Sequence, residues 1–287
     1  MNKLLIIVLF CTLFSCSKAE KEIFNLHGGR IFVIGHGGAG FETAFNYLPE
    51  NSLGSIERCI VALSSDGVEV DVQLTQDNEL VLYHDNRLET QTNCLGCIRA
   101  KNFNEVLECR FTKNFVTAVL TEEKIISLRS ILERYSSRNP RPKIFLDVRL
   151  FDECYDFSDF DSLIDIYTQS ILNLIVEFNY HQEIYVESAS VQFLKRMQDK
   201  APGLKYLVDS SFFESTLDSV IANNFYGIVI ENKKISREQV KIAHDHNVNV
   251  VIFNTRSRNS NLEAVNKHPD YIQTDEIILL QQILMNK

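Results

Sequence analysis

The sequence predicts an α/β protein built as a (β/α)₈ TIM barrel, and three observations lead to that fold. Strand-like and helix-like segments alternate almost to the end of the chain, as they do when crossover helices wind a parallel sheet. The length of 287 residues and the hydrophobic fraction of 45% suit one such barrel with a full core. About eight such strand–helix repeats favour a closed barrel over the alternative, a doubly wound open sheet.

The predicted strands are short apolar runs, and helical spacing of apolar side chains follows most of them. The strands cover residues 31–35, 67–72, 80–84, 143–148, 183–187, 204–208, 226–230 and 248–253, with a short closing run at 271–273. The helices cover residues 52–64, 127–135, 158–178, 190–200, 215–223 and 236–246. Several helices open with serine, a good N-cap residue. Residues 86–142 are long for one connection and predict an excursion near the barrel mouth.

The first residues predict an export signal rather than part of the fold. Residues 1–15 combine Lys3 with an apolar run that is too short for a stable membrane anchor. The run ends Leu13-Phe14-Ser15-Cys16, which resembles a bacterial lipoprotein signal. That resemblance implies a lipid anchor at Cys16 in the bacterial cell envelope, on the periplasmic or the outer side; plain secretion and an uncleaved anchor are the alternatives. Residues 16–28 then form a polar tether, and residues 29–287 form the barrel domain.

Five of the seven cysteines lie in the folded part of the chain, and an exported protein permits disulfides. Because five is odd, at least one cysteine is unpaired or paired elsewhere. Cys59 falls on the apolar face of a predicted helix and is interpreted as a core residue. Cys94-Leu95-Gly96-Cys97 has no second C-x-x-C, which disfavours zinc, so we expect a disulfide within the group Cys94, Cys97 and Cys109.

The candidate site lies where apolar runs end in carboxylate and histidine side chains. Glu69 and Asp71 are two residues apart on one strand, so they project from the same face. An apolar core does not accept two carboxylates unless a cation lies between them. His36, His84 and Asp147 end neighbouring strands, and catalytic groups of such barrels gather at these ends. The oxygen ligands predict Mg²⁺ or Ca²⁺ rather than zinc, and two histidines suit general acid and base catalysis.

Other charged residues receive plainer interpretations. Arg149 shares a strand face with Asp147 and is suited to hold phosphate oxygens. Arg256 and Arg258 are interpreted as part of a solvated loop, with phosphate binding as the less favoured alternative. Glu187 and Glu231 are interpreted as rim groups. The remaining histidines in helices or polar loops are predicted at the surface: His181, His244, His246 and His268. The formal net charge of −9 argues against a nucleic-acid partner.

The motifs together resemble the glycerophosphodiester phosphodiesterase family, (β/α)₈ barrels that cleave phosphodiesters with a metal ion. The family reads His-Arg-Gly, Glu-Asn-Thr, Glu-x-Asp-Val and His-Asp. The matching residues here are His36-Gly37-Gly38, Glu50-Asn51-Ser52, Glu69-Val70-Asp71-Val72 and His84-Asp85. Weaker matches at 75–77, 126–128, 146–149, 247–256 and 273–275 extend the resemblance over nearly the whole mature chain.

The resemblance implies roles for individual residues and a substrate. His36 and His84 would be the acid/base pair, and Glu69, Asp71 and Asp147 would bind the cation. The other implied site residues are Glu50, which would order the site by hydrogen bonds, and Arg149, Phe253 and Arg256, which would contact the substrate or its phosphate. The substrates would be glycerophosphodiesters, small molecules of lipid metabolism, cleaved to glycerol phosphate and an alcohol.

Four positions depart from the family pattern. Gly37 stands where the family has a phosphate-binding arginine, and Asp147 replaces a longer glutamate. Arg149 replaces a lysine, and Phe253 replaces a tryptophan. These changes bear on the substrate more than on the type of reaction. Two other functions stay open: a phospholipase-C-like or sphingomyelinase-D-like lyase that releases a cyclic phosphate, and a non-catalytic surface lipoprotein that binds a ligand.

Overall fold

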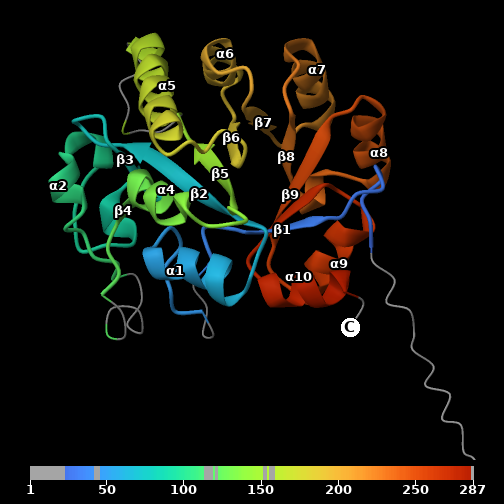
Figure 1. Ribbon diagram of the computed structural model, residues 1–287, viewed down its shortest axis with the longest axis horizontal. Coiled ribbons are helices and arrows are strands. Elements are labelled where there is room, and N and C mark those ends of the chain that lie inside the picture. Colours follow the sequence, from blue (N-terminus) through green and yellow to red (C-terminus); the bar gives the residue numbers. More distant parts are fainter. Residues whose placement is uncertain are drawn as a thin grey trace, which may run out of the picture.

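The computed structural model describes residues 23–41, 46–112, 119, 122–150, 154 and 159–285, and in this part of the chain eight parallel strands close into a barrel (Figure 1). The barrel strands, in pairing order, are β1 (Phe32–Gly35), β2 (Gly67–Leu74), β5 (Lys143–Val148), β6 (Ile184–Ser188), β7 (Lys205–Asp209), β8 (Gly227–Glu231), β9 (Asn249–Thr255) and β10 (Tyr271–Thr274). Because β1 pairs with both β10 and β2, the ring is closed. The predicted (β/α)₈ barrel is confirmed.

One predicted strand lies outside the barrel. The end of β2 pairs antiparallel with β3 (Leu80–Leu82), which pairs in turn with β4 (Ile126–Ser127). The prediction that residues 80–84 form a barrel strand is wrong, because the turn after β2 makes a hairpin instead of a crossover. The hairpin still returns His84 to the level of Asp71, since the residue before His84 donates its N–H to the Asp71 carbonyl at 3.0 Å.

A ring of helices surrounds the strands in Figure 1. These helices are α1 (Leu53–Glu57), α4 (Leu128–Ser136), α5 (Phe160–Glu177), α6 (Val191–Lys200), α7 (Phe213–Asn223), α8 (Arg237–Asp245), α9 (Arg258–Asn266) and α10 (Ile277–Leu284). A π-helix at Arg58–Ala62 continues α1. Serine hydroxyls cap α1, α4, α6 and α8, as predicted. The prediction omits α9 and α10, and Ser257 caps α9 within the stretch interpreted as a solvated loop.

Side chains inside the barrel alternate with period two, and this alternation stacks a polar layer on an apolar plug. The plug consists of Ile34, Phe145, Tyr185, Leu207, Val229, Val251 and Tyr271. Each plug residue is followed, two positions closer to the carboxyl end of its strand, by a residue on the same inward face. These residues are His36, Asp147, Glu187, Asp209, Glu231, Phe253 and Gln273. The plug therefore seals the barrel from below and leaves these side chains at the mouth.

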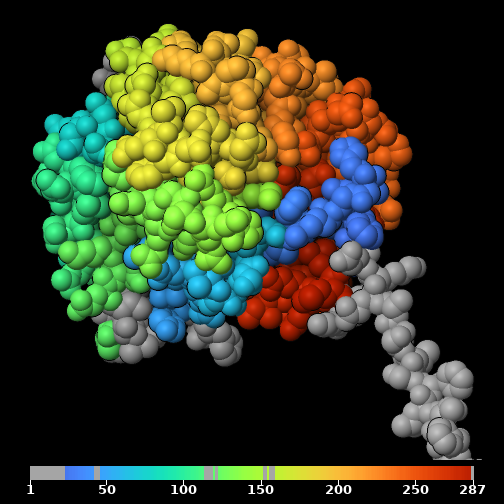
Figure 2. Space-filling model, in the orientation of Figure 1, coloured from blue at the N-terminus to red at the C-terminus, as the bar shows by residue number. Residues whose placement is uncertain are grey.

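The start of the described chain lies across the opposite end of the barrel. In Figure 2 this segment is blue and lies beside the orange residues of α8. Asn25 donates to Asp270 at 2.9 Å, and the His27 ring stacks on His244 with centroids 3.8 Å apart. His244 is only 6% exposed and its Nε2 lies 2.8 Å from Asp270 Oδ2. The predicted surface position of His244 is therefore wrong.

The predicted signal peptide, residues 1–15, and the predicted lipid anchor at Cys16 lie outside the described residues. The described helices include none that is both long and apolar enough to span a bilayer. Export and anchoring stay predictions.

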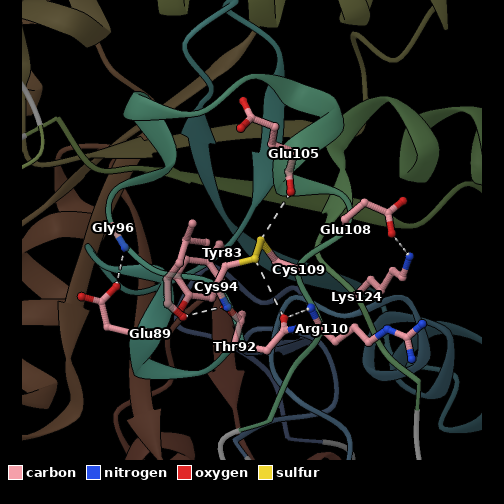
Figure 3. Close-up of a disulfide and its surroundings, with 12 residues drawn as sticks. Tyr83, Glu89, Thr92, Cys94, Gly96, Glu105, Glu108, Cys109, Arg110 and Lys124 are labelled. Carbon is pink, nitrogen blue, oxygen red and sulfur yellow. Dashed lines mark hydrogen bonds and ion pairs between the residues drawn. A yellow bond between two sulfur atoms is a disulfide. The ribbon is translucent and has the colours of Figure 1, made fainter.

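The excursion beside the mouth has a small core of its own, formed by Val81, Tyr83, Leu88, Ile98, Val106, Cys109, Phe111 and Ile125. The short helix α2 (Phe103–Val106) packs on this core and lies at the left edge of Figure 1. Cys94 is bonded to Cys109 (Figure 3), so the expected disulfide is confirmed. A second bond, between Cys97 and Cys154, joins the excursion to the loop after β5. Cys59 is free and buried, as predicted.

Removal of the first disulfide tests how much it stabilises the excursion. The double substitution Cys94→Ser and Cys109→Ser is expected to lower the free energy of unfolding by about 3 kcal/mol, because the bond closes a 15-residue loop in the unfolded chain. Urea denaturation under non-oxidising and non-reducing conditions measures the loss. A double variant as stable as the wild type would contradict the expectation.

Candidate active site

His36 directly follows β1, and the carboxylate of Asp275 orients its ring. Its Nδ1 lies 2.9 Å from Asp275 Oδ1, in the loop after β10. Its Nε2 lies 4.0 Å from Glu69 Oε2, inside the barrel mouth. A carboxylate at Nδ1 fixes the orientation of the ring, so Nε2 faces the acidic centre of the barrel.

Glu69, Asp71 and Asp147 form a cluster in which one oxygen of each carboxylate lies within 4.8 Å of the others. Strand register brings them together, because Asp71 on β2 is directly opposite Asp147 on β5. Their exposed fractions are 3%, 4% and 9%. Burial, followed by the charges of the other two carboxylates, raises the pKa of Glu69 well above its ordinary value. Burial also raises the pKa of Asp147, although the charge of Arg149 opposes the change.

Arg149 connects two of these carboxylates with His84. Its Nε donates to Asp147 Oδ2 at 2.9 Å, and its Nη2 lies 3.1 Å from Asp71 Oδ1. Its Nη1 lies 3.0 Å from His84 Nε2, and a guanidinium can only donate, so this imidazole nitrogen accepts. His84 Nδ1 then carries the proton that faces Asp85 Oδ1 at 3.0 Å. Burial lowers the pKa of His84, but the bond to Asp85 and the nearby carboxylates outweigh it and leave that pKa raised.

The segment before α1 supports the site from one side. Asn51 donates to Asp71 Oδ2 at 2.8 Å and accepts from the Asp71 N–H at 2.9 Å, which orients this carboxylate. Glu50 instead accepts from Gln91 Nε2 at 2.8 Å. Gly37 has a φ of +56°, and a Cβ there would lie 2.8 Å from the Glu50 Cβ. An arginine at position 37 would therefore require Glu50 to move.

A cavity of about 280 Å³ opens beside the carboxylate cluster. Glu187, Asp209, Phe253 and Gln273 line it, together with His36, Glu69, Asp147, Val148, Arg149, Leu150, Ser188, Ala189 and Val229. Gln273 Nε2 donates to Glu187 Oε1 at 2.7 Å. Burial and the charge of Asp147 raise the pKa of Asp209 to about 7. The cavity thus combines hydrogen-bonding carboxyl groups with one aromatic wall, which suits a small polar molecule.

A second guanidinium, that of Arg256, contacts the same Asp275 carboxylate that orients His36. Arg256 Nε lies 3.2 Å from Asp275 Oδ2, and the Arg256 guanidinium lies 4.7 Å from the centre of the Phe41 ring. The Phe41 ring meets the rings of His36 and His84 edge-on, with centroids 4.8 and 6.1 Å apart. The two histidines, Phe41 and Arg256 therefore border one mouth.

Comparison with known proteins agrees with this arrangement. A family model described as the glycerophosphoryl diester phosphodiesterase family matches residues 43–279. The chain belongs to this family. A glycerophosphodiester phosphodiesterase of Caldanaerobacter subterraneus subsp. tengcongensis is 25% identical over 162 residues, which are 55% of this chain and 60% of that protein. A Bacillus subtilis (strain 168) relative is 30% identical over 108 residues, 38% of this chain and 42% of its own length. The chain thus matches about half the length of these curated relatives.

Solved structures of the phosphodiesterase type share the barrel. A glycerophosphodiester phosphodiesterase from Parabacteroides distasonis has a TM-score of 0.73 at 19% identity, covering 89% of this chain and 97% of that one. A phosphodiesterase from Oleispira antarctica, solved with the product sn-glycerol-3-phosphate, has a TM-score of 0.72 at 17% identity, with coverages of 89% and 97%. At these identities the likeness establishes the common fold.

The structure of this family member brings the predicted site residues to one end of the barrel. His36, His84, Glu69, Asp71, Asp147 and Arg149 surround the mouth, Phe253 lines the cavity, and Arg256 and Glu50 lie at its edge. Seven further residues lie at the site that had no role in the sequence analysis or were only motif or rim residues there: Phe41, Asn51, Asp85, Gln91, Glu187, Asp209 and Asp275. The motifs Glu50-Asn51, His84-Asp85 and Thr274-Asp275 are the sequence signals for three of these.

Proposed function

We propose that this protein is a metal-dependent phosphodiesterase that hydrolyses glycerophosphodiesters to glycerol phosphate and an alcohol. The observation that carries the proposal is the pairing of two oriented histidines with one buried carboxylate cluster. His36 is held by Asp275, and His84 is held by Asp85, so both rings present Nε2 toward the mouth. A ligand-binding protein has little need for such a pair, whereas acid–base catalysis requires two proton-transfer groups.

The carboxylate cluster fits a divalent cation. Three carboxylates face one guanidinium, that of Arg149, which leaves two negative charges to balance. The residues that would hold the ion are Glu69, Asp71 and Asp147, and oxygen donors of this kind suit Mg²⁺ or Ca²⁺. When bound, the ion would neutralise a phosphate oxygen as charge develops there.

The histidines would move the protons of the reaction. One imidazole Nε2 takes a proton from the attacking water as the new P–O bond forms. The other donates a proton to the alcohol oxygen as its P–O bond breaks. Asp275 and Asp85 stabilise whichever ring is positively charged, since each lies about 3 Å from an Nδ1.

The surrounding residues would hold the substrate. Arg149 and Arg256 offer guanidinium groups on the two sides of the mouth, which fits the binding of phosphate oxygens. Arg256 would supply the positive charge near His36 that the family's arginine supplies at the position of Gly37. Glu187 and Asp209 would accept hydrogen bonds from glycerol hydroxyls, with Phe253 packing against the carbon chain.

Turnover of a panel of glycerophosphodiesters by the leaderless protein tests the proposal. We expect release of glycerol phosphate that EDTA stops and that Mg²⁺ or Ca²⁺ restores, because the carboxylate cluster needs a cation. Mass analysis of the products identifies the reaction. A cyclic phosphate among them would show that the protein is a lyase and not a hydrolase. Absence of turnover by folded protein with either metal would contradict the proposal and favour a binding protein.

A further inference from the structure

Gln91 connects the two segments that carry the candidate acid/base residues. Its side chain is buried, with 1% exposed, and belongs to the excursion rather than to the barrel. Its Nε2 donates to Glu50 Oε1 at 2.8 Å and to Asp85 Oδ2 at 2.7 Å. An amide NH₂ group has two hydrogens, so one goes to each carboxylate.

On one side, Glu50 supports the turn that carries His36. The Glu50 Cβ packs against Gly37, at the distance that only a glycine allows. The next residue, Asn51, donates its N–H to the Gly37 carbonyl at 2.7 Å. The segment that carries Glu50 is therefore in direct contact with the backbone beside His36.

On the other side, Asp85 orients His84. Asp85 Oδ1 lies 3.0 Å from His84 Nδ1, while its other oxygen receives the hydrogen bond from Gln91. The Asp85 carbonyl accepts from Gln73 Nε2 at 3.0 Å, which fixes the main chain but not the carboxylate. Gln91 thus restrains the rotation of the carboxylate that aligns the His84 ring.

Hydrogen bonds within the excursion restrain the loop that carries Gln91. The Gln91 carbonyl accepts from the Thr112 N–H at 2.7 Å. Thr92 Oγ1 donates to the Leu88 carbonyl at 2.7 Å and accepts from the Cys94 N–H at 3.1 Å, beside the Cys94–Cys109 disulfide in Figure 3. These contacts limit the freedom of the short loop on which Gln91 lies.

We propose that Gln91 is a positioning residue that fixes the alignment of His84 relative to His36. One amide restrains two carboxylates, each of which supports one histidine segment. Without it, Glu50 and Asp85 lose their shared donor, and the carboxylate that aligns the His84 ring is less restrained. This inference rests on the proposed function, because it assigns Gln91 to the same reaction.

The test compares Gln91→Leu with Thr92→Val in the full leaderless protein loaded with the activating metal. Leucine has a similar size but no hydrogen-bonding group. Thr92→Val removes side-chain bonds of the same loop but keeps the bond from the Thr112 N–H to the Gln91 carbonyl, and it does not touch Glu50 or Asp85. We expect Gln91→Leu to lower kcat by about tenfold or more with KM within about twofold, as for other residues that orient catalytic groups through hydrogen bonds. Thr92→Val is expected to keep kcat within about twofold. Imidazole ¹⁵N NMR provides a second readout, in which Gln91→Leu changes the His84 signals and Thr92→Val does not.

Two results would overturn the inference: unchanged kcat in Gln91→Leu, or an equal loss of kcat in Thr92→Val. An altered kcat with unaltered His84 signals would also count against it, since positioning of the ring would then be intact. If the wild type shows no turnover, the proposed function is wrong, and kcat cannot test the role of Gln91. The His84 NMR signals of Gln91→Leu and Thr92→Val then test whether Gln91 positions the ring.

Discussion

Replacing His36 with alanine is expected to lower kcat by about 10²- to 10⁴-fold while the barrel still folds, because a positioned acid or base contributes a factor of that size. His36 lies at the mouth rather than in the apolar plug, so its loss opens no core cavity. KM should change less than kcat, since the groups suited to bind phosphate are Arg149 and Arg256. Steady-state release of glycerol phosphate measures both constants.

His246→Ala is the matched control, because His246 is exposed at the end of α8. It should leave both constants unchanged. His36→Asn keeps a polar group near Asp275, and its thermal unfolding separates a catalytic loss from a folding loss. Turnover of His36→Ala within about threefold of the wild type would contradict the role of His36 in proton transfer.

The barrel could be predicted because its signals are local. Apolar runs of four to eight residues, helical spacing and serine caps are all visible along the chain. The hairpin of β2 and β3 could not be separated from a barrel strand, because parallel and antiparallel strands share the same period of two. The helices α9 and α10 were missed since Arg258–Asn266 is too polar to show a clear apolar face, and Ile277–Leu284 is apolar nearly throughout.

The site could be predicted where its partners are close in sequence. Glu69 and Asp71 share a face by spacing alone, and the family motifs add His36 and His84. His84 adjoins its partner Asp85, but His36 and Asp275 are distant in the sequence, so spacing alone does not pair them. His244 was misplaced for the same reason, because the residues that cover it belong to the start of the chain.

Replacing Glu69 with glutamine is expected to change stability and activity in opposite directions. Without metal, burial and the charges of Asp71 and Asp147 raise the pKa of Glu69. The fold then binds more protons than the unfolded chain between the ordinary and the raised pKa, so its stability falls as pH rises through that interval. Glutamine carries no charge, so Glu69→Gln should raise the Tm of the EDTA-treated protein at neutral pH. Its turnover should fall by about 10²-fold or more, because one cation-binding oxygen is lost.

Thermal unfolding with added Mg²⁺ or Ca²⁺ gives the second half of this test. An ion at 100 times its Kd adds about 2.7 kcal/mol to the stability of the wild type, and Glu69→Gln should lose most of that increase. Glu231→Gln is the control, since Glu231 also ends a barrel strand but bonds to Asn254 outside the cluster. If the metal stabilises Glu69→Gln as strongly as the wild type, the ion binds elsewhere. If Glu69→Gln lowers the Tm in EDTA, the bond from the Gly37 N–H at 2.7 Å stabilises ionised Glu69 more than burial disfavours it, and the charge argument for the cation loses its force.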